Sequence, residues 1–211
     1  MAAQYSYREE LTHSGTHGLG VLLSIAGMTL ILIRASQNND AWQVLSGLIY
    51  GCSLIALYLS STIYHALPQG KRKVLLRRVD HAIIYVMIAG SYTPITLTSL
   101  RDDYGWLVFS SVWLLAVAGL YLELVAKKSY RKVAIALYLG MGWLILLAIK
   151  PLSANFPSNG ITLLVAGGLF YSVGVLFYLR KSMPYHHLIW HLFVMAGSVL
   201  HYLAYLFYIY P

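Results

Sequence analysis

The sequence predicts an all-α, polytopic membrane protein built as a bundle of seven transmembrane helices. The 211-residue chain is 59% hydrophobic and only 10% charged, whereas a soluble domain carries about 25% charged residues. Seven continuous apolar runs also approach the roughly 20 residues that a helix needs to cross a bilayer. These runs cover residues 18–33, 42–64, 82–100, 106–126, 133–149, 161–179 and 187–208.

The distribution of charge predicts the orientation of the bundle. All but three of the 15 Lys and Arg residues fall in the N-terminal segment or in the loops after the second, fourth and sixth runs. The exceptions are Arg34, Arg101 and Lys150. Because Lys- and Arg-rich loops stay in the cytoplasm, the N-terminus is expected inside and the C-terminus outside. The net charge of +8 is then explained by topology and anionic lipids, and nucleic acid is not an expected partner.

Two regions are expected, a cytoplasmic N-terminal segment (1–17) and a transmembrane domain (18–211). The N-terminus lacks a basic n-region and a small-residue cleavage site, so the first run is expected to be an uncleaved insertion signal. Thr12 or Ser14 is expected to cap the first helix. The single cysteine, Cys52, lies inside the second run, so no disulfide can form within the chain.

The runs also carry local signals for packing. In the second run, Gly47-x-x-x-Gly51 predicts close approach of a neighbouring helix. In the third, Pro94 predicts a kink. At the end of the fourth, Glu123 is four residues before Lys127, which favours an interfacial ion pair over a role in a site. The fifth and sixth runs lack charged side chains before their ends and are expected to be scaffold. The last run ends in tyrosines that suit the outer membrane interface.

Polar residues from three runs are predicted to meet at one depth near the cytoplasm. His187 and His191 are four apart and therefore share a helix face. His65 ends the second run, and Asp80 precedes the third, on the same side of the membrane. Three imidazoles with an open fourth position are typical of catalytic zinc, so Zn²⁺ is the predicted cofactor.

Two further side chains complete the predicted chemistry. Zinc activates water near neutral pH, and Asp80 could act as the general base for that water. Ser61 lies one helical turn before His65 and could orient the water or stabilise an oxyanion. An alternative for Asp80 is an ion pair with Arg77 or Arg78.

The other histidines are expected to be ordinary polar side chains at the interface. His201 lies about 15 Å deeper than His191 on a straight helix. It is therefore excluded from the same coordination shell, although it could line a cavity above it. The remaining members of this group are His13, His17, His81 and His186.

These motifs resemble the hemolysin III family, the bacterial branch of the progestin and adipoQ receptor superfamily. The matching pieces are Ser61-x-x-x-His65, Asp80 in RRVDHAIIYVMIAGSYTP, His187-x-x-x-His191 in HHLIWH, and the N-terminal THGLG. The resemblance implies zinc held by His65, His187 and His191, with Asp80 reaching it through water. It also implies a multi-pass protein of the bacterial cytoplasmic (inner) membrane, a role in membrane-lipid and fluidity homeostasis, and kinship with alkaline ceramidases.

The expected function is therefore zinc-dependent hydrolysis of a lipid amide or ester, with membrane lipids as partners and a fatty-acyl lipid as substrate. One alternative is a non-enzymatic sensor or receptor with a structural zinc. A second is a pore-forming hemolysin. A transporter is disfavoured because no internal repeat is evident. The substrate and the oligomeric state stay open.

Overall fold

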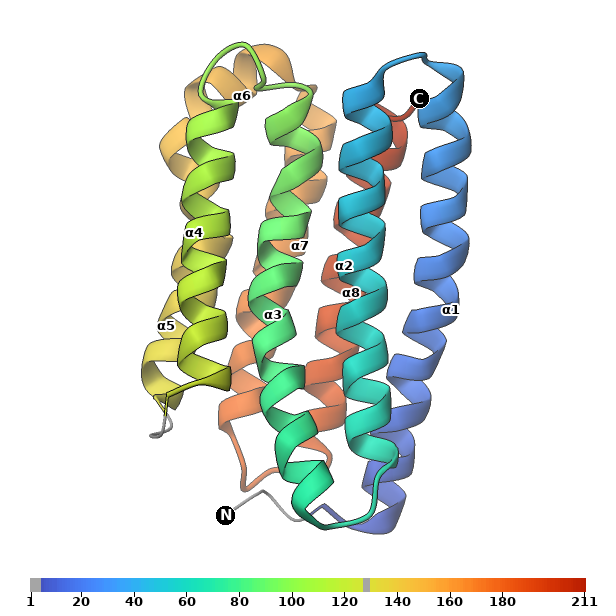
Figure 1. Cartoon of the computed structure of the whole chain (residues 1–211), viewed down its shortest axis with the longest axis vertical. Coiled ribbons are helices and arrows are strands. Elements are labelled where there is room, and N and C mark those ends of the chain that lie inside the picture. Colours follow the sequence, from blue (N-terminus) through green and yellow to red (C-terminus); the bar gives the residue numbers. More distant parts are fainter. Residues whose placement is uncertain (1–4, 127–129) are drawn as a thin grey trace.

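The computed structural model describes residues 5–126 and 130–211, and every regular element within these ranges is a helix. The helices run along one long axis as a bundle, with the start of α1 and the C-terminus at opposite ends (Figure 1). In chain order the elements are α1 (Tyr7–Gln37), α2 (Ala41–Ala66), α3 (Lys71–Leu97), α4 (Gly105–Leu124), α5 (Arg131–Gly142), the 3₁₀ helix η1 (Leu144–Ala148), α6 (Ile149–Asn155), α7 (Ser158–Leu179) and α8 (His186–Tyr208).

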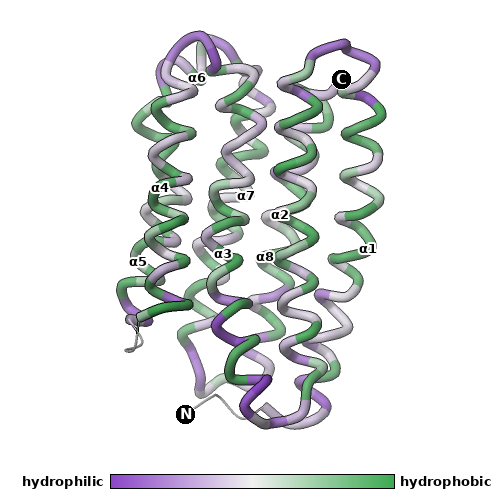
Figure 2. Tube along the Cα trace, in the orientation of Figure 1, coloured by the Kyte–Doolittle hydropathy of each residue, from purple (hydrophilic) through white to green (hydrophobic). Residues whose placement is uncertain are grey.

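The outer surface of the bundle is that of a multi-pass membrane protein. Six helical runs are long and apolar enough to cross a bilayer: α1, α2, α4, Arg131–Asn155, α7 and α8. Polar residues gather at the two ends of the bundle, and an apolar band lies between them (Figure 2). Leu114 is 70% exposed and Leu147 is 87% exposed. Large apolar side chains exposed in such numbers suit contact with lipid rather than water.

Helix α3 is the remaining predicted crossing, and it is not among those six runs. It lies between α2 and α4 (Figure 1), and every residue from 89 to 97 is buried. Because protein rather than lipid surrounds it, this helix can carry Ser91, Thr93 and Thr96, while its low hydropathy comes mainly from the charged residues in its first ten positions. It also continues through Pro94 and ends at Leu97. The count of seven crossings stays a prediction, and an odd number agrees with the start of α1 and the C-terminus lying at opposite ends of the bundle.

Helix α1 begins at Tyr7, well before the predicted first span. The side chain of Ser6 accepts a hydrogen bond from the backbone of Glu9, and the Glu9 carboxylate accepts one from the backbone of Ser6. This reciprocal capping box fixes the start of the helix. The predicted caps, Thr12 and Ser14, were wrong, because both lie inside α1. Their hydroxyls donate to the carbonyls of Glu9 and Thr62, respectively. The N-terminal segment therefore enters the bundle as part of one long helix.

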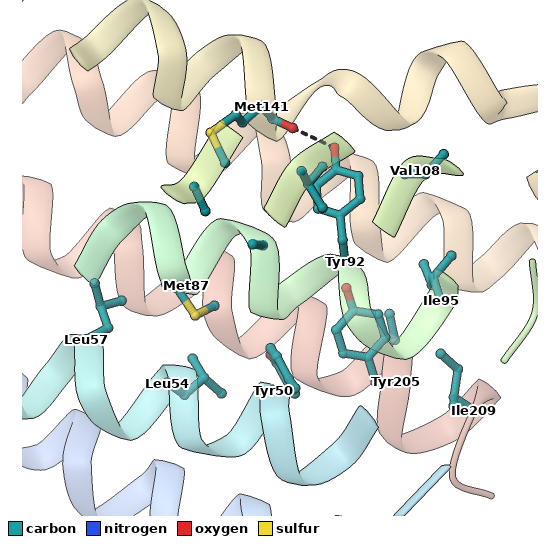
Figure 3. Packing of buried hydrophobic residues seen from close by; sticks show 14 of the residues in the cluster. Tyr50, Leu54, Leu57, Met87, Tyr92, Ile95, Val108, Met141, Tyr205 and Ile209 are labelled. Atoms are coloured by element: carbon teal, nitrogen blue, oxygen red, sulfur yellow. Dashed lines mark hydrogen bonds between the residues drawn. The ribbon is translucent and has the colours of Figure 1, made fainter. Parts of the chain in front are cut away.

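The predicted fifth span is not one uninterrupted helix. The Tyr92 hydroxyl donates to the carbonyl oxygen of Met141 at 2.7 Å (Figure 3) and accepts from the backbone nitrogen of Ile145 at 3.0 Å. A side chain of α3 thus supplies hydrogen-bond partners where α5 gives way to η1. The expectation of a continuous helix over 133–149 was wrong. The hydrogen bonds at the interruption come from Tyr92 of α3, which the sequence of the fifth run by itself does not reveal.

The packing predicted from Gly47 and Gly51 is confirmed. A Cβ atom added at Gly51 would lie 2.3 Å from Cγ of Met28, and one at Gly47 would lie 2.6 Å from Cγ2 of Ile31. Both neighbours belong to α1, so the glycines let α1 and α2 approach closely. This contact fixes the register of α1 against α2 and hence the position of its histidines.

Candidate metal centre

Five buried histidines converge at the end of the bundle where α1 begins: His13 and His17 of α1, His65 of α2, and His187 and His191 of α8. The three histidines singled out from the sequence do meet. Nε2 of His187 lies 3.2 Å from Nε2 of His65 and 3.1 Å from Nε2 of His191.

The interpretation of His13 as a satisfied interfacial side chain was wrong. Its side chain is fully buried, and neither ring nitrogen has a hydrogen-bond partner among the residues that the structure describes. His13, His65 and His187 each present one nitrogen, and these three atoms lie within 4.8 Å of one another. The sequence held a signal for this, since His13 and His17 have the same i, i+4 spacing as His187 and His191.

His17 joins the cluster in a different manner. Its ring stacks on His191 with centres 3.6 Å apart and planes inclined by 9°. Its two nitrogens also lack hydrogen-bond partners in the described part of the chain. His17 therefore packs against a site residue, and its interpretation as a satisfied interfacial side chain was also wrong.

A carboxylate orients His65 from behind. Oε2 of Glu10 lies 2.6 Å from Nδ1 of His65, and Nζ of Lys73 forms an ion pair with Oε1 of Glu10 at 2.9 Å. Neither Glu10 nor Lys73 was predicted as part of the site. Lys73 was instead assigned to a basic loop that sets the membrane topology. A carboxylate on the outer nitrogen of a histidine fixes its tautomer and ring orientation, as it does around many metal ligands.

The nitrogen geometry fits zinc. When Nδ1–H of His65 donates to Glu10, Nε2 of His65 presents a lone pair to His187. Nε2 of His187 faces two other nitrogens, and a single proton there can serve only one of these contacts. A cation accepts all three lone pairs. Two nitrogens bound to tetrahedral zinc lie about 3.3 Å apart. This is close to the 3.2 Å and 3.1 Å that separate Nε2 of His187 from Nε2 of His65 and of His191.

An interior cavity of about 530 Å³ reaches this cluster. His187, His191, Asp80 and Ser61 contribute to its wall at that end. Asp80 and Ser61 are both buried. The predicted general base and its neighbouring hydroxyl therefore border the same space as two of the predicted ligands.

The alternative ion pair for Asp80 is not found in the part of the chain that the structure describes. Arg78 instead donates to the backbone carbonyls of Glu123 at 2.6 Å and Ala126 at 3.0 Å. The predicted partner of Glu123, Lys127, lies outside the described residues, and so does Lys128.

The remaining histidines lie along the cavity. Nε2 of His201 donates to the carbonyl of Leu164 at 3.0 Å, and His201 lines the cavity, as predicted for a residue apart from the cluster. His81 and His186 also contribute to the wall. The Tyr138 hydroxyl donates to the backbone carbonyl of His81.

Tyr5 covers the cluster from the side where the chain begins. Its ring stacks on His187 at 5.1 Å and meets His13 edge-on at 4.9 Å. Burial raises the pKa of the Tyr5 hydroxyl above its ordinary value, so this group stays neutral. The aromatic ring therefore shields the histidines without adding charge.

Comparison with known proteins identifies relatives that match most of the chain. A family model described as Haemolysin-III related matches residues 5–202. Hemolysin-3 of Bacillus cereus is 41% identical over 97% of this chain and 93% of its own length. The Hemolysin-3 homolog of Bacillus subtilis (strain 168) is 42% identical over 97% and 96%. The human monocyte to macrophage differentiation factor is 32% identical over 96% and 85%.

Proposed function

The chain belongs to the haemolysin-III related family, and from that premise we propose that it is a zinc-dependent hydrolase of a membrane-lipid amide or ester. The observation that carries the proposal is that two of the three predicted ligands, His187 and His191, border one cavity together with Asp80 and Ser61. Its volume of about 530 Å³ falls in the usual range of roughly 300–1,000 Å³ for small-molecule sites. Bound zinc would polarise the acyl carbonyl and make water nucleophilic near neutral pH.

The protein's own side chains divide the remaining work. His65, His187 and His191 hold the metal, and Glu10 fixes the orientation of His65. Asp80 accepts the proton of the attacking water, because it borders the cavity and is free of an arginine partner. The Ser61 hydroxyl donates a hydrogen bond to the water or to the developing negative charge on the carbonyl oxygen.

The substrate reaches this chemistry from the bilayer. Helices α5 and α7 border the cavity on one side, where Nε1 of Trp143 donates to Oγ of Ser172 at 3.0 Å. Arg131 also lies 4.8 Å above the ring of Tyr178. A lipid that enters between α5 and α7 separates these two side-chain contacts. Its acyl chain then lies in the cavity and its polar group near the histidines.

The cellular setting of the proposal follows the charge distribution. The cluster lies at the end of the bundle that carries most of the basic residues, so the chemistry faces the cytoplasm. We assign the chain to a bacterial cytoplasmic membrane, with a role in lipid and fluidity homeostasis.

Two measurements on detergent-purified protein test the proposal. Metal analysis should find zinc in the wild type and in His201→Gln, and loss of zinc in His191→Ala. Equal zinc in the wild type and His191→Ala would remove the metal site. Zinc-loaded protein should also release fatty acid from a panel of ceramides, phospholipids and acyl amides. Asp80→Asn should keep its zinc and lose about 10²–10⁴-fold in rate. A zinc-loaded wild type that acts on no member of the panel would end the hydrolase proposal.

The second candidate is a non-enzymatic sensor or receptor with a structural zinc. The position of His13 favours it, because a fourth imidazole beside the predicted three suits the closed coordination of structural sites. In that case, removal of zinc lowers the thermal stability of the protein, and no lipid in the panel is hydrolysed. A pore, the remaining alternative, predicts ion flux in liposomes that survives loss of His187.

A further inference from the structure

We propose that His13 is a fourth protein ligand to the metal, so that helix α1 closes the site in the resting protein. This inference rests on the zinc site of the proposed function. It adds a ligand from a helix that contributes none of the three histidines predicted from the sequence.

The four rings occupy the corners of a nearly regular tetrahedron. With zinc–nitrogen bonds of about 2.0–2.1 Å and each ring centre roughly 1 Å beyond its ligand atom, tetrahedral coordination separates the ring centres by about 5 Å. All six separations are close to that value. They are 4.7 Å for His13–His65, 4.9 Å for His13–His187, 5.3 Å for His13–His191, 5.1 Å for both His65–His187 and His65–His191, and 4.5 Å for His187–His191.

The state of the His13 side chain points to the same role. It is fully buried, and within residues 5–126 and 130–211 neither of its nitrogens has a hydrogen-bond partner. A buried polar group that lacks a partner is unfavourable. Its nitrogen also belongs to the set that lies within 4.8 Å of the ligand nitrogens of His65 and His187. A metal bond to His13 satisfies one of these unpaired atoms.

The neighbouring His17 is excluded by its orientation. Its ring is almost parallel to that of His191 and lies 3.6 Å above it. Stacked rings face each other with their π surfaces, whereas their lone pairs lie in the ring planes. The nitrogens of His17 and His191 therefore do not converge on one ion. His17 is consequently the matched control for His13, one helical turn away on the same helix.

Contacts on both sides of His13 hold α1 in place. Three residues before it, Glu10 contacts His65 and Lys73. One residue after it, Oγ of Ser14 donates to the carbonyl of Thr62 at 3.1 Å. These contacts tie the same turn of α1 to α2 and to the start of α3. With the fourth position filled by His13 in the resting protein, the attacking water and the acyl group of the proposed reaction reach the metal only after His13 leaves it.

X-ray absorption at the zinc edge tests the assignment, because multiple scattering counts coordinated imidazoles. The wild type should show four imidazole nitrogens. His13→Gln should show three imidazoles and one oxygen or amide ligand, while His17→Gln keeps four. Competition with a chelator should show a loss of zinc affinity in His13→Gln. The loss should exceed the roughly 10–100-fold that follows removal of a residue that only hydrogen-bonds to a metal ligand.

A wild-type spectrum with three imidazoles and one oxygen would overturn the inference, even if no variant folds. Unchanged imidazole number and affinity in His13→Gln would do the same. Both results leave the three-histidine site and the hydrolase proposal intact. A wild type that binds no zinc removes the metal site itself, and absent fatty-acid release affects only the hydrolase proposal.

Discussion

Two consecutive glutamates of α1 have different tasks, although their side chains are chemically identical. Glu9 closes the capping box with Ser6 at the start of the helix. Glu10 points toward α2 and contacts His65 and Lys73. The difference arises from the 100° turn between successive helical residues, which puts one carboxylate at the helix end and the other inside the site.

Glu10→Gln is expected to lower zinc affinity by about 10–100-fold, because His65 loses the carboxylate that fixes its tautomer. Chelator competition on purified protein measures this. Glu9→Gln is the matched control, since glutamine also serves in a capping box, and its zinc affinity should equal that of the wild type. Equal affinity in both variants would show that Glu10 does not support the metal ligand.

The sequence identified part of this site for a definite physical reason. His65, Asp80, His187 and His191 lie in or beside long apolar helices, where polar side chains stand out and the charge distribution assigns their depth. Glu10, His13 and Lys73 lie in segments that are polar in any case, so they do not stand out against their neighbours. The spacing of His13 and His17 was a signal, but only the packing of α1 against α2 and α8 shows where that pair lies.

At the level of helices, the contact between α1 and α2 depends on small residues. Gly51→Ala places a methyl group within 2.3 Å of Cγ of Met28 and should destabilise the protein by about 1–3 kcal/mol. Gly140→Ala meets open space and should leave stability unchanged or raise it by roughly 0.5–1 kcal/mol. Thermal unfolding in detergent compares the two variants. Equal destabilisation in the two variants would show that the close approach of α1 and α2 at Gly51 does not determine stability.

The break between α5 and η1 depends on one hydroxyl group. Tyr92→Phe leaves the carbonyl of Met141 and the backbone nitrogen of Ile145 without that partner, which should reduce stability by about 1–3 kcal/mol. Tyr121→Phe, at an exposed position of α4, should change stability by less than about 0.5 kcal/mol. Calorimetry in detergent distinguishes them. An unaffected Tyr92→Phe would mean that the local sequence alone causes the break.

Sequence patterns located every long helix, because hydrophobic length is a property of each segment by itself. They did not locate the interruption after Gly142, which needs Tyr92 of α3, or the early start of α1, which needs the Ser6–Glu9 pair. The enclosed α3 is the converse case. Its sequence from residue 82 on is apolar enough to suggest a crossing, yet the Lys, Arg and Asp residues in its first ten positions lower the hydropathy that marks one.

For the whole molecule, the charge distribution predicts an odd number of crossings with the N-terminus in the cytoplasm. Reporters fused at the N-terminus and inserted at Gly70 should report the cytoplasm, and a reporter after Pro211 should report the outside. Both termini on one side of the membrane would contradict this topology and show that α3 does not cross. Insertion between Asn38 and Asp40, expected outside, is the internal control.

Helix α1 connects the two ends of the bundle without a break. It is continuous from Tyr7 to Gln37, and Arg34 near its far end donates to the carbonyls of Leu206 and Tyr210. His13 lies 21 residues from that anchor, about 32 Å along the axis. Helices in bilayers of different thickness adjust by tilting. A tilt of about 5° about the anchor moves the His13 end by roughly 3 Å, more than the length of a zinc–nitrogen bond. Because Glu10 and Ser14 tie the His13 end of α1 to α2, a change in bilayer thickness that tilted this helix would have to break those contacts before it moved the buried imidazole.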